Sequence, residues 1–314
     1  MGHKCYQIYL GMEKKKLKTL DERIKQDLND LFDGKPIKAA NDLLNELFGE
    51  AASKEHAIST EGMPGYYAGD RNAKTVMVML NPGANAKKKD EKYKEEIRKS
   101  GIDKSSLETF INSYHSRCHT GVEKDLDRDG KIRIDNFDIK QAAFLKDWLD
   151  SGVTIHADFP CDVKEDRDLH REVRVNVLEQ KLQLELIPYA SQKFSSLGSK
   201  KLIYLFPYLE TALDEIFRIN DRKYVVFCSR FFERLFKAYS NEQNKDFQIT
   251  LLEKKSKSGI LNNGKVYCTT VKIVHQGKEL IAIIAHTFPN QSLPNAYDKM
   301  REYGKFCYEC WTNS

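Results

Sequence analysis

Two polar segments that follow short apolar runs carry the strongest chemical signal in this sequence. The first run is followed by Asn81, Pro82 and Gly83, and the last run is followed by His286. An asparagine side chain and exposed backbone amides at a strand end can bind a ligand. Pro82 fixes the turn there, and Gly83 lets a ligand approach the backbone closely. A histidine in the second position can stabilise developing negative charge.

Four apolar runs predict the strands that would position these residues. They cover 75–80, 182–187, 224–228 and 280–285, and each is apolar at nearly every position, as in strands buried on both faces. Helical patterns lie between them. We therefore predict an α/β fold, a three-layer α/β/α arrangement around a mostly parallel four-stranded sheet, in which ligands bind beyond the carboxyl ends of the strands. Turns at Asn263-Gly264 and Gln276-Gly277 predict antiparallel hairpins before the last strand.

The remaining length divides into two additions to this core. Helical patterns over 12–32 and 36–48 predict an N-terminal helical extension of residues 1–58, followed by an α/β domain of residues 59–314. Between the first two strands lie about 100 residues, far more than a crossover connection needs. We predict a long, mainly helical insertion over about 86–180, on the rim where a substrate would enter.

Composition excludes several classes of protein. The chain has 314 residues, 31% charged and 40% hydrophobic, and a net charge of +5, which permits a polyanionic partner. No apolar stretch is long enough to span a membrane, and the opening MGHKCY lacks the apolar core of a signal peptide. We expect a cytoplasmic protein without membrane contact, whose seven scattered cysteines are reduced thiols.

The motifs together resemble the uracil-DNA glycosylase superfamily, in a poorly characterised branch. The segment LNPG after the first strand is similar to the first motif of that superfamily, and the loop HTFPNQSLP after the last strand is similar to the second. The segments PGYYAGD at 64–70 and ELIPYAS at 185–191 also resemble that branch. The second motif is longer here, and the segment Cys228-Ser229-Arg230 after the third strand lacks a base-reading asparagine.

This resemblance implies roles for individual residues. Asn81 would orient the attacking water, and His286 would hydrogen-bond the base carbonyl as negative charge builds. The implied substrate contacts are Pro82, Gly83, Tyr66, Tyr67, Tyr189, Ser191, Ser229 and Arg230. The implied DNA contacts are Lys87, Lys88, Lys89, Ser292 and Leu293, of which Leu293 would wedge into the duplex. No metal and no cofactor are implied.

The implied function is that of a DNA glycosylase hydrolysing the N-glycosidic bond of a flipped-out uracil or modified pyrimidine in double- or single-stranded DNA. The long insertion favours a larger base, such as a hypermodified base of phage DNA, and hence a role in anti-phage defence as well as repair. The alternative is a catalytically inactive protein on the same fold that binds nucleic acid or a nucleotide. A small-molecule-binding α/β domain is a third hypothesis. The sequence leaves the base and the oligomeric state open.

Other candidate metal ligands have simpler interpretations. The loop starting at Asp125 matches the first eight positions of a calcium-binding EF-hand loop, but Asn136 stands where the bidentate glutamate is required. His115 and His119 lack an identifiable third ligand. Cys307 and Cys310 form one isolated CxxC pair. We interpret these as an Asp-rich turn, a helix surface and packing residues.

Overall fold

The computed structural model describes residues 18–49, 58–81, 105–120, 126–191, 199–242, 246–261, 264–286 and 296–314. The strands in this part are β1 (Tyr67–Gly69), β2 (Thr75–Met79), β3 (Leu182–Glu185), β4 (Tyr224–Phe227), β5 (Gln248–Ser258), β6 (Lys265–His275) and β7 (Lys278–Ile284). The helices are α2 (Leu20–Phe32), α3 (Lys38–Phe48), α6 (Leu107–Thr120), α7 (Asn136–Leu145), α8 (Arg167–Gln180), the 3-10 helix η2 (Ser199–Leu205), α9 (Phe206–Phe217), α10 (Phe231–Ser240) and α11 (Tyr297–Thr312).

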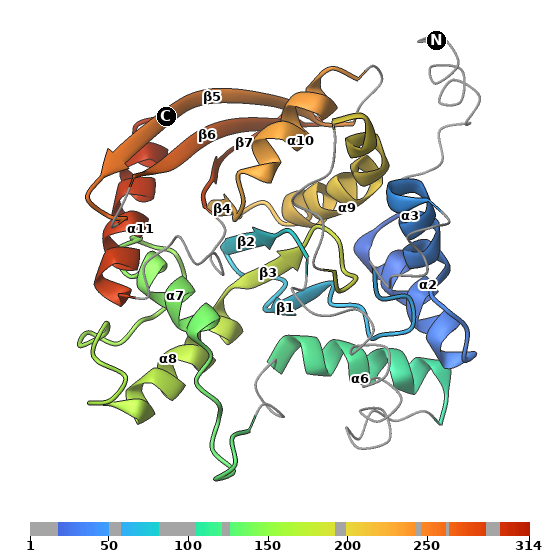
Figure 1. Ribbon diagram of the computed structural model, residues 1–314, viewed down its shortest axis with the longest axis horizontal. Coiled ribbons are helices and arrows are strands. Elements are labelled where there is room, and N and C mark those ends of the chain that lie inside the picture. The colour runs from blue at the N-terminus through green and yellow to red at the C-terminus, as the bar shows by residue number, and fades with distance from the viewer. Residues whose placement is uncertain are drawn as a thin grey trace.

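All seven strands form one mixed sheet in the order β1-β3-β2-β4-β7-β6-β5 (Figure 1). The four strands β3, β2, β4 and β7 are parallel and coincide with the four apolar runs. The expected four-stranded sheet is therefore wrong in its extent, because β1, β6 and β5 add antiparallel strands at its two edges. Edge strands bury less surface than central ones and need fewer apolar residues. Strand β5 is rich in lysine and β1 has only three residues, so neither forms an apolar run.

The two antiparallel hairpins predicted before the last strand are present as β5–β6 and β6–β7, although Asn263 of the first turn lies outside the described residues. Gln276 and Gly277, which join β6 to β7, have φ angles of +50° and +78°. Two positive φ values in a two-residue loop match the right-handed twist of a hairpin. Gly264, with φ of +105°, precedes β6 at the end of the β5–β6 connection.

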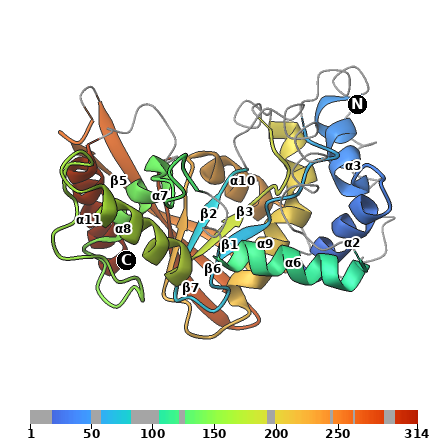
Figure 2. The same cartoon turned by 90° about the horizontal axis from the view of Figure 1, so that it is seen from below.

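Two hydrophobic cores lie on the two faces of the sheet. Because side chains alternate along a strand, Val76 and Val78 face the first core, whereas Met77 and Met79 face the second. Helices α2, α3, α6, α9 and α10 contribute to the first core. Helices α7, α8 and α11 contribute to the second, and Figure 2 shows the sheet between these two groups of helices.

The N-terminal helices share the first core with the sheet. Helix α2 begins at Leu20, later than the sequence pattern indicated, because Thr19 and Glu22 form a reciprocal capping box. Ile24 and Leu28 of α2 are fully buried in the first core. Residues 12–17 of the predicted helix lie outside the described residues.

The long segment between β2 and β3 supplies helices to both cores, α6 to the first and α7 and α8 to the second. Its helices α7 and α8 pack with α11 over the second core, so this part is more than a rim. Helix α11 approaches α7 closely at Gly304, where an added Cβ atom would lie 1.8 Å from the carbonyl oxygen of Phe144. Among the helices that the structure describes, none is long and apolar enough to span a bilayer.

Candidate active site

Asn81 and His286 follow two strands of the same parallel set. Val78, Phe227 and Ile284 form one row across β2, β4 and β7. Asn81 lies three residues after this row and His286 two residues after it, so both lie at the carboxyl edge of the sheet. Neighbouring strands are about 4.8 Å apart, which places the β2 and β7 backbones about 10 Å from each other. The two residues therefore flank the end of β4.

Asn81 connects the ends of β2 and β3. Its Nδ2 donates to the carbonyl oxygen of Ser191 at 2.5 Å, and its side chain remains partly exposed. This bond fixes the orientation of the Asn81 amide. The structure thus brings two of the predicted site residues, Asn81 and Ser191, into direct contact.

His286 is held in one tautomer by the neighbouring strand. The backbone N–H of Tyr267 donates to its Nε2 at 3.1 Å, so in the neutral ring Nδ1 carries the proton. The backbone N–H of His286 donates to the Tyr303 hydroxyl at 2.8 Å, and that hydroxyl donates to the carbonyl oxygen of Tyr267 at 2.8 Å. Burial, with the charges of Arg230 and Lys254, lowers the pKa of His286. His286 is therefore a neutral donor through Nδ1 at pH 7.

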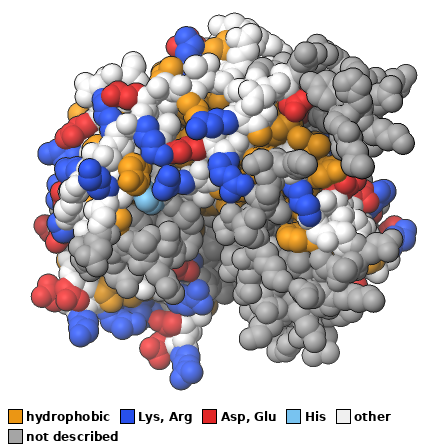
Figure 3. Space-filling model, turned by 45° about the horizontal axis from the view of Figure 1, so that its top comes forward, with side chains coloured by type: hydrophobic (Ala, Val, Ile, Leu, Met, Phe, Trp, Pro, Cys, Tyr) orange, Lys and Arg blue, Asp and Glu red, His pale blue; other side chains and the backbone are white. Residues whose placement is uncertain are grey.

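A basic surface adjoins the histidine. The Arg230 guanidinium and the Lys254 ammonium each lie 5.0 Å from the centre of the Tyr267 ring, which in turn stacks on His286. Lys254 is paired with Glu233 at 3.0 Å, whereas no described acidic group forms an ion pair with the exposed Arg230. On the face drawn in Figure 3, Lys and Arg side chains gather over β5 and α10. Such a surface suits an anionic ligand.

Ser229 precedes α10. Its Oγ accepts from the backbone N–H of Phe231 at 3.2 Å, and the residue is buried. Ser229 therefore supports the turn that carries Arg230 to the surface, between the ends of β2 and β7.

Three tyrosines predicted to contact substrate have hydroxyl groups that are engaged inside the protein. The hydroxyls of Tyr66 and Tyr189 both donate to Asp27 Oδ2 at 2.7 Å, and all three side chains are buried. Burial raises the pKa of Asp27 to about 6. The Tyr67 hydroxyl lies 2.8 Å from His115 Nδ1. These contacts tie α2 and α6 to β1 and β3.

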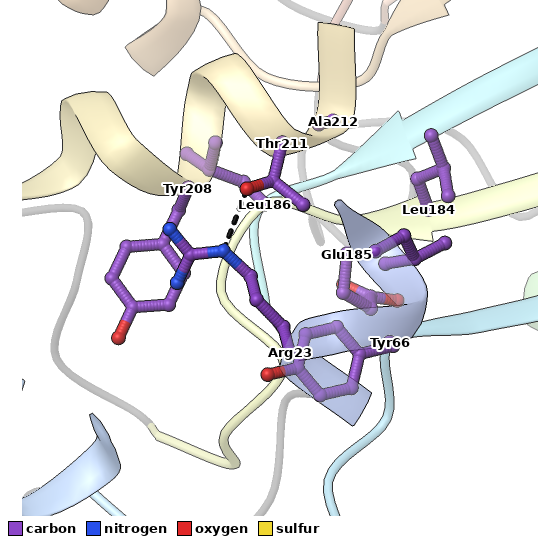
Figure 4. A pocket seen from close by; sticks show the side chains of 9 residues that line it. Arg23, Tyr66, Leu184, Glu185, Leu186, Tyr208, Thr211 and Ala212 are labelled. Atoms are coloured by element: carbon purple, nitrogen blue, oxygen red, sulfur yellow. Dashed lines mark hydrogen bonds between the residues drawn. The ribbon is translucent and has the colours of Figure 1, made fainter. Parts of the chain in front are cut away.

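Two small pockets lie beside this tyrosine cluster. The first has a free volume of about 10 Å³, room for about one water molecule, and Figure 4 shows its lining with the bond from Arg23 Nε to Thr211 Oγ1 at 2.6 Å. The second, of about 180 Å³, is lined by polar residues of α2 and α3 together with Tyr66. The tyrosine cluster thus lies on the α2 side of the sheet.

Seven other predicted contacts cannot be placed. Pro82, Gly83, Lys87, Lys88, Lys89, Ser292 and Leu293 lie outside the described residues. Their roles remain predictions from the sequence.

The sequence interpretation missed a polar pair in β3. Gln183 and Glu185 alternate with Leu182 and Leu184, and their side chains belong to the face of the second core. Burial raises the pKa of Glu185 to about 8. The alternating pattern LQLE carried the signal, because a strand buried on both faces has little reason to place polar residues at two positions of one face.

The candidate metal ligands are used in other ways. Asp127 Oδ1 accepts from the backbone N–H groups of Asp129 and Lys131, and its Oδ2 accepts from Arg171, while Asp125 lies outside the described residues. Cys307 and Cys310 are buried free thiols. In the described parts of the chain, no three His, Cys, Asp or Glu side chains are grouped to hold a metal ion.

Comparisons of this chain with protein-family models, with curated proteins and with solved structures found no significant match. The chemistry of the site itself must therefore carry any assignment of function.

Proposed function

We propose that this protein is a DNA glycosylase-like enzyme that hydrolyses the N-glycosidic bond of a flipped-out uracil or modified pyrimidine. The observation that carries the proposal is the position of Asn81 and His286 at one edge of the parallel sheet, after two strands whose backbones are about 10 Å apart. A separation of this size can accommodate a planar base between two side chains.

The chemistry requires a placed water and a donor aimed at the departing base. Water attacks C1′ of the sugar, the bond from C1′ to the base nitrogen breaks, and the base leaves with the bonding electron pair. The proton that the water loses as the C1′–O bond forms passes through solvent to the base, which is released neutral. Asn81 would hold the water, and His286 Nδ1–H would donate to the base oxygen as negative charge develops there. A neutral histidine suits this role, because burial and the nearby Arg230 and Lys254 lower its pKa.

The basic surface supports a DNA partner. Arg230 is exposed beside His286 and has no described carboxylate paired with it, so it can bind a phosphate next to the flipped nucleotide. Phosphate contacts of this kind would help to offset the cost of unstacking the base, about a few kcal/mol.

A second candidate function is binding without catalysis, as nucleic-acid or nucleotide recognition on the same fold. The observation that favours it is that Asn81 Nδ2 and His286 Nε2 are both engaged in internal hydrogen bonds, with Ser191 and Tyr267. In that case the edge of the sheet would recognise a base and leave its glycosidic bond intact.

Base excision distinguishes the two candidates. We would incubate the protein with single-stranded and duplex oligonucleotides carrying uracil, hydroxymethylcytosine or glucosylated cytosine, and cut abasic sites with hot alkali. The enzyme proposal expects cleavage of at least one substrate and a loss of about 100-fold or more in Asn81→Ala, with wild-type rates in the exposed control Asn220→Ala. If the protein binds DNA but cleaves none of these substrates, the proposal of an enzyme is refuted and the proposal of a binding protein stands.

A further inference from the structure

The end of β3 carries a buried polar network whose hydrogen bonding is incomplete. Gln183 Oε1 accepts from Lys181 Nζ at 3.2 Å and from Gln141 Nε2 at 3.4 Å, and Gln183 Nε2 donates to Glu185 Oε1 at 2.9 Å. Four buried side-chain atoms in the described residues lack a hydrogen-bond partner, and Glu185 Oε2 and Gln141 Oε1 are two of them. Buried polar atoms are nearly always paired, so this network is missing partners.

Glu185 lies next to the candidate active site. It is the last residue of β3 and pairs with Met79 of β2, two residues before Asn81. The ladder continues past this point, because the Ile187 N–H donates to the Leu80 carbonyl at 3.0 Å. Glu185 therefore lies one strand away from the residue two positions before Asn81, at the same carboxyl edge of the sheet. The residue is half-buried, while its Oε2 is shielded from solvent.

The network also decides which oxygen carries a proton. Burial raises the pKa of Glu185 to about 8, against the lowering effects of Gln183 and Lys181, so the side chain is a neutral acid at pH 7. The Lys181 ammonium donates to Gln183 Oε1, so the oxygen of that amide faces Lys181 and its nitrogen faces Glu185. Since Glu185 Oε1 accepts from that nitrogen, the acid proton lies on Oε2. Oε2 is therefore a hydrogen-bond donor without an acceptor.

We propose that Glu185 Oε2–H donates to a carbonyl oxygen of the flipped base and so selects bases that carry an oxo group. The inference deepens the proposed function and rests on it, because it takes the carboxyl edge of the sheet as the base-binding site. Uracil and cytosine both offer a carbonyl oxygen, whereas adenine does not. A site that leaves a buried donor unpaired rejects a ligand that lacks the matching acceptor.

Binding in a non-cutting background tests this proposal directly. Asn81→Ala protein would be titrated with duplexes containing one deoxyuridine, its 2-thio analogue or its 4-thio analogue, since sulfur is a weak acceptor. The variants are Glu185→Gln, which keeps a donor, and Glu185→Leu, which removes it. The control is Glu279→Gln, an exposed carboxylate near the start of β7, at the end of that strand away from His286.

We expect one thio analogue to bind about 10-fold more weakly than deoxyuridine when Glu185 is present. Glu185→Leu should weaken deoxyuridine binding by about 10-fold and abolish the difference between oxygen and sulfur, while Glu279→Gln changes neither. Deoxyuridine affinity with Glu185 should fall as the pH rises through about 8, because the donor ionises, and Glu185→Gln should stay flat to pH 9. A thermal unfolding scan at each pH separates this effect from loss of the fold.

Equal binding of all three probes, or no change in Glu185→Leu protein that remains folded, would overturn the proposal and assign Oε2 to an internal water. Excision assays on protein with Asn81 intact distinguish this failure from that of the enzyme. If Glu185→Leu cleaves as fast as the wild type, base recognition by Glu185 is refuted and the glycosylase activity stands. If the protein binds deoxyuridine in preference to a thio analogue but cleaves no substrate, base recognition by Glu185 stands and the glycosylase activity is refuted.

Discussion

The backbone N–H of Tyr267 donates to Nε2 of His286 at 3.1 Å and thereby sets the tautomer of that histidine. A residue of β6, which is antiparallel to β7, thus controls the donor that β7 presents at its carboxyl end. This contact leaves Nδ1–H as the donor of the neutral ring, and the sheet fixes the direction of that donor.

The first prediction concerns the protonation of His286. We expect the neutral Nδ1–H tautomer at pH 7 and a pKa below the ordinary 6.5, because burial and the charges of Arg230 and Lys254 disfavour the imidazolium. A lowered folded pKa means that the stability linked to His286 is present above pH 6.5 and is lost as the pH falls through the folded pKa. Long-range proton–nitrogen NMR, assigned with His286→Gln, reports the tautomer. An Nε2–H ring or a charged ring at pH 7 would contradict the assignment.

The second prediction concerns Arg230 and DNA. Arg230→Ala should weaken binding to duplex DNA uniformly across sequences and reduce the slope of log affinity against log salt by about 1, since one phosphate contact is lost. Fluorescence titrations at several salt concentrations measure both quantities. Lys278→Ala is the control, because Lys278 begins β7 at the opposite end of that strand. Equal losses in the two variants would show that Arg230 has no special place in DNA binding.

The third prediction concerns the buried carboxyl of Asp27. Its folded pKa of about 6 lies above the ordinary 3.8, so the folded state retains the proton between these values. The stabilisation is present below pH 3.8 and is lost as the pH rises through about 6, and it amounts to about 3 kcal/mol. Asp27→Asn, which keeps an acceptor for Tyr66 and Tyr189, should remove this slope.

Denaturant unfolding between pH 4 and pH 7 measures the Asp27 effect. The exposed carboxylate Asp42 of α3 provides the control as Asp42→Asn. If Asp27→Asn retains the pH dependence of the wild type, the slope comes from another group and the assignment to Asp27 is wrong.

The fourth prediction concerns the contact between α11 and α7. Gly304→Ala would place a methyl group 1.8 Å from the Phe144 carbonyl oxygen, so the helices must separate, and Trp148, which donates to the Gly304 carbonyl, must move with them. We expect a loss of about 3 kcal/mol or more in the free energy of unfolding. Gly34→Ala is the matched control, because its φ is +71° but no atom lies within 4 Å of the added group. It should lose only about 1 kcal/mol, and equal losses would refute the steric argument.

Much of the fold could be predicted from local patterns. The four parallel strands are continuous apolar runs, and the β6–β7 turn carries Gln276 and Gly277, which adopt the positive φ angles of a hairpin. The strands at the sheet edges were not predicted as such, because β5 has one face exposed and β1 has only three residues, so neither shows the pattern of full burial. The roles of α7 and α8 were also hidden, since a long segment between two strands says nothing of which face it covers.

The sequence by itself determined that Asn81 and His286 follow buried parallel strands, and hence that both lie at one edge of a sheet. Only the tertiary structure decided their surroundings. Ser191 contacts Asn81 from a segment 110 residues away, and Tyr267 contacts His286 from a neighbouring antiparallel strand. The same holds for Tyr66 and Tyr189, which bond to Asp27 of a distant helix. The physical reason is that periodicity reports which face a residue buries, whereas hydrogen-bond partners and pKa shifts depend on which chain segments meet.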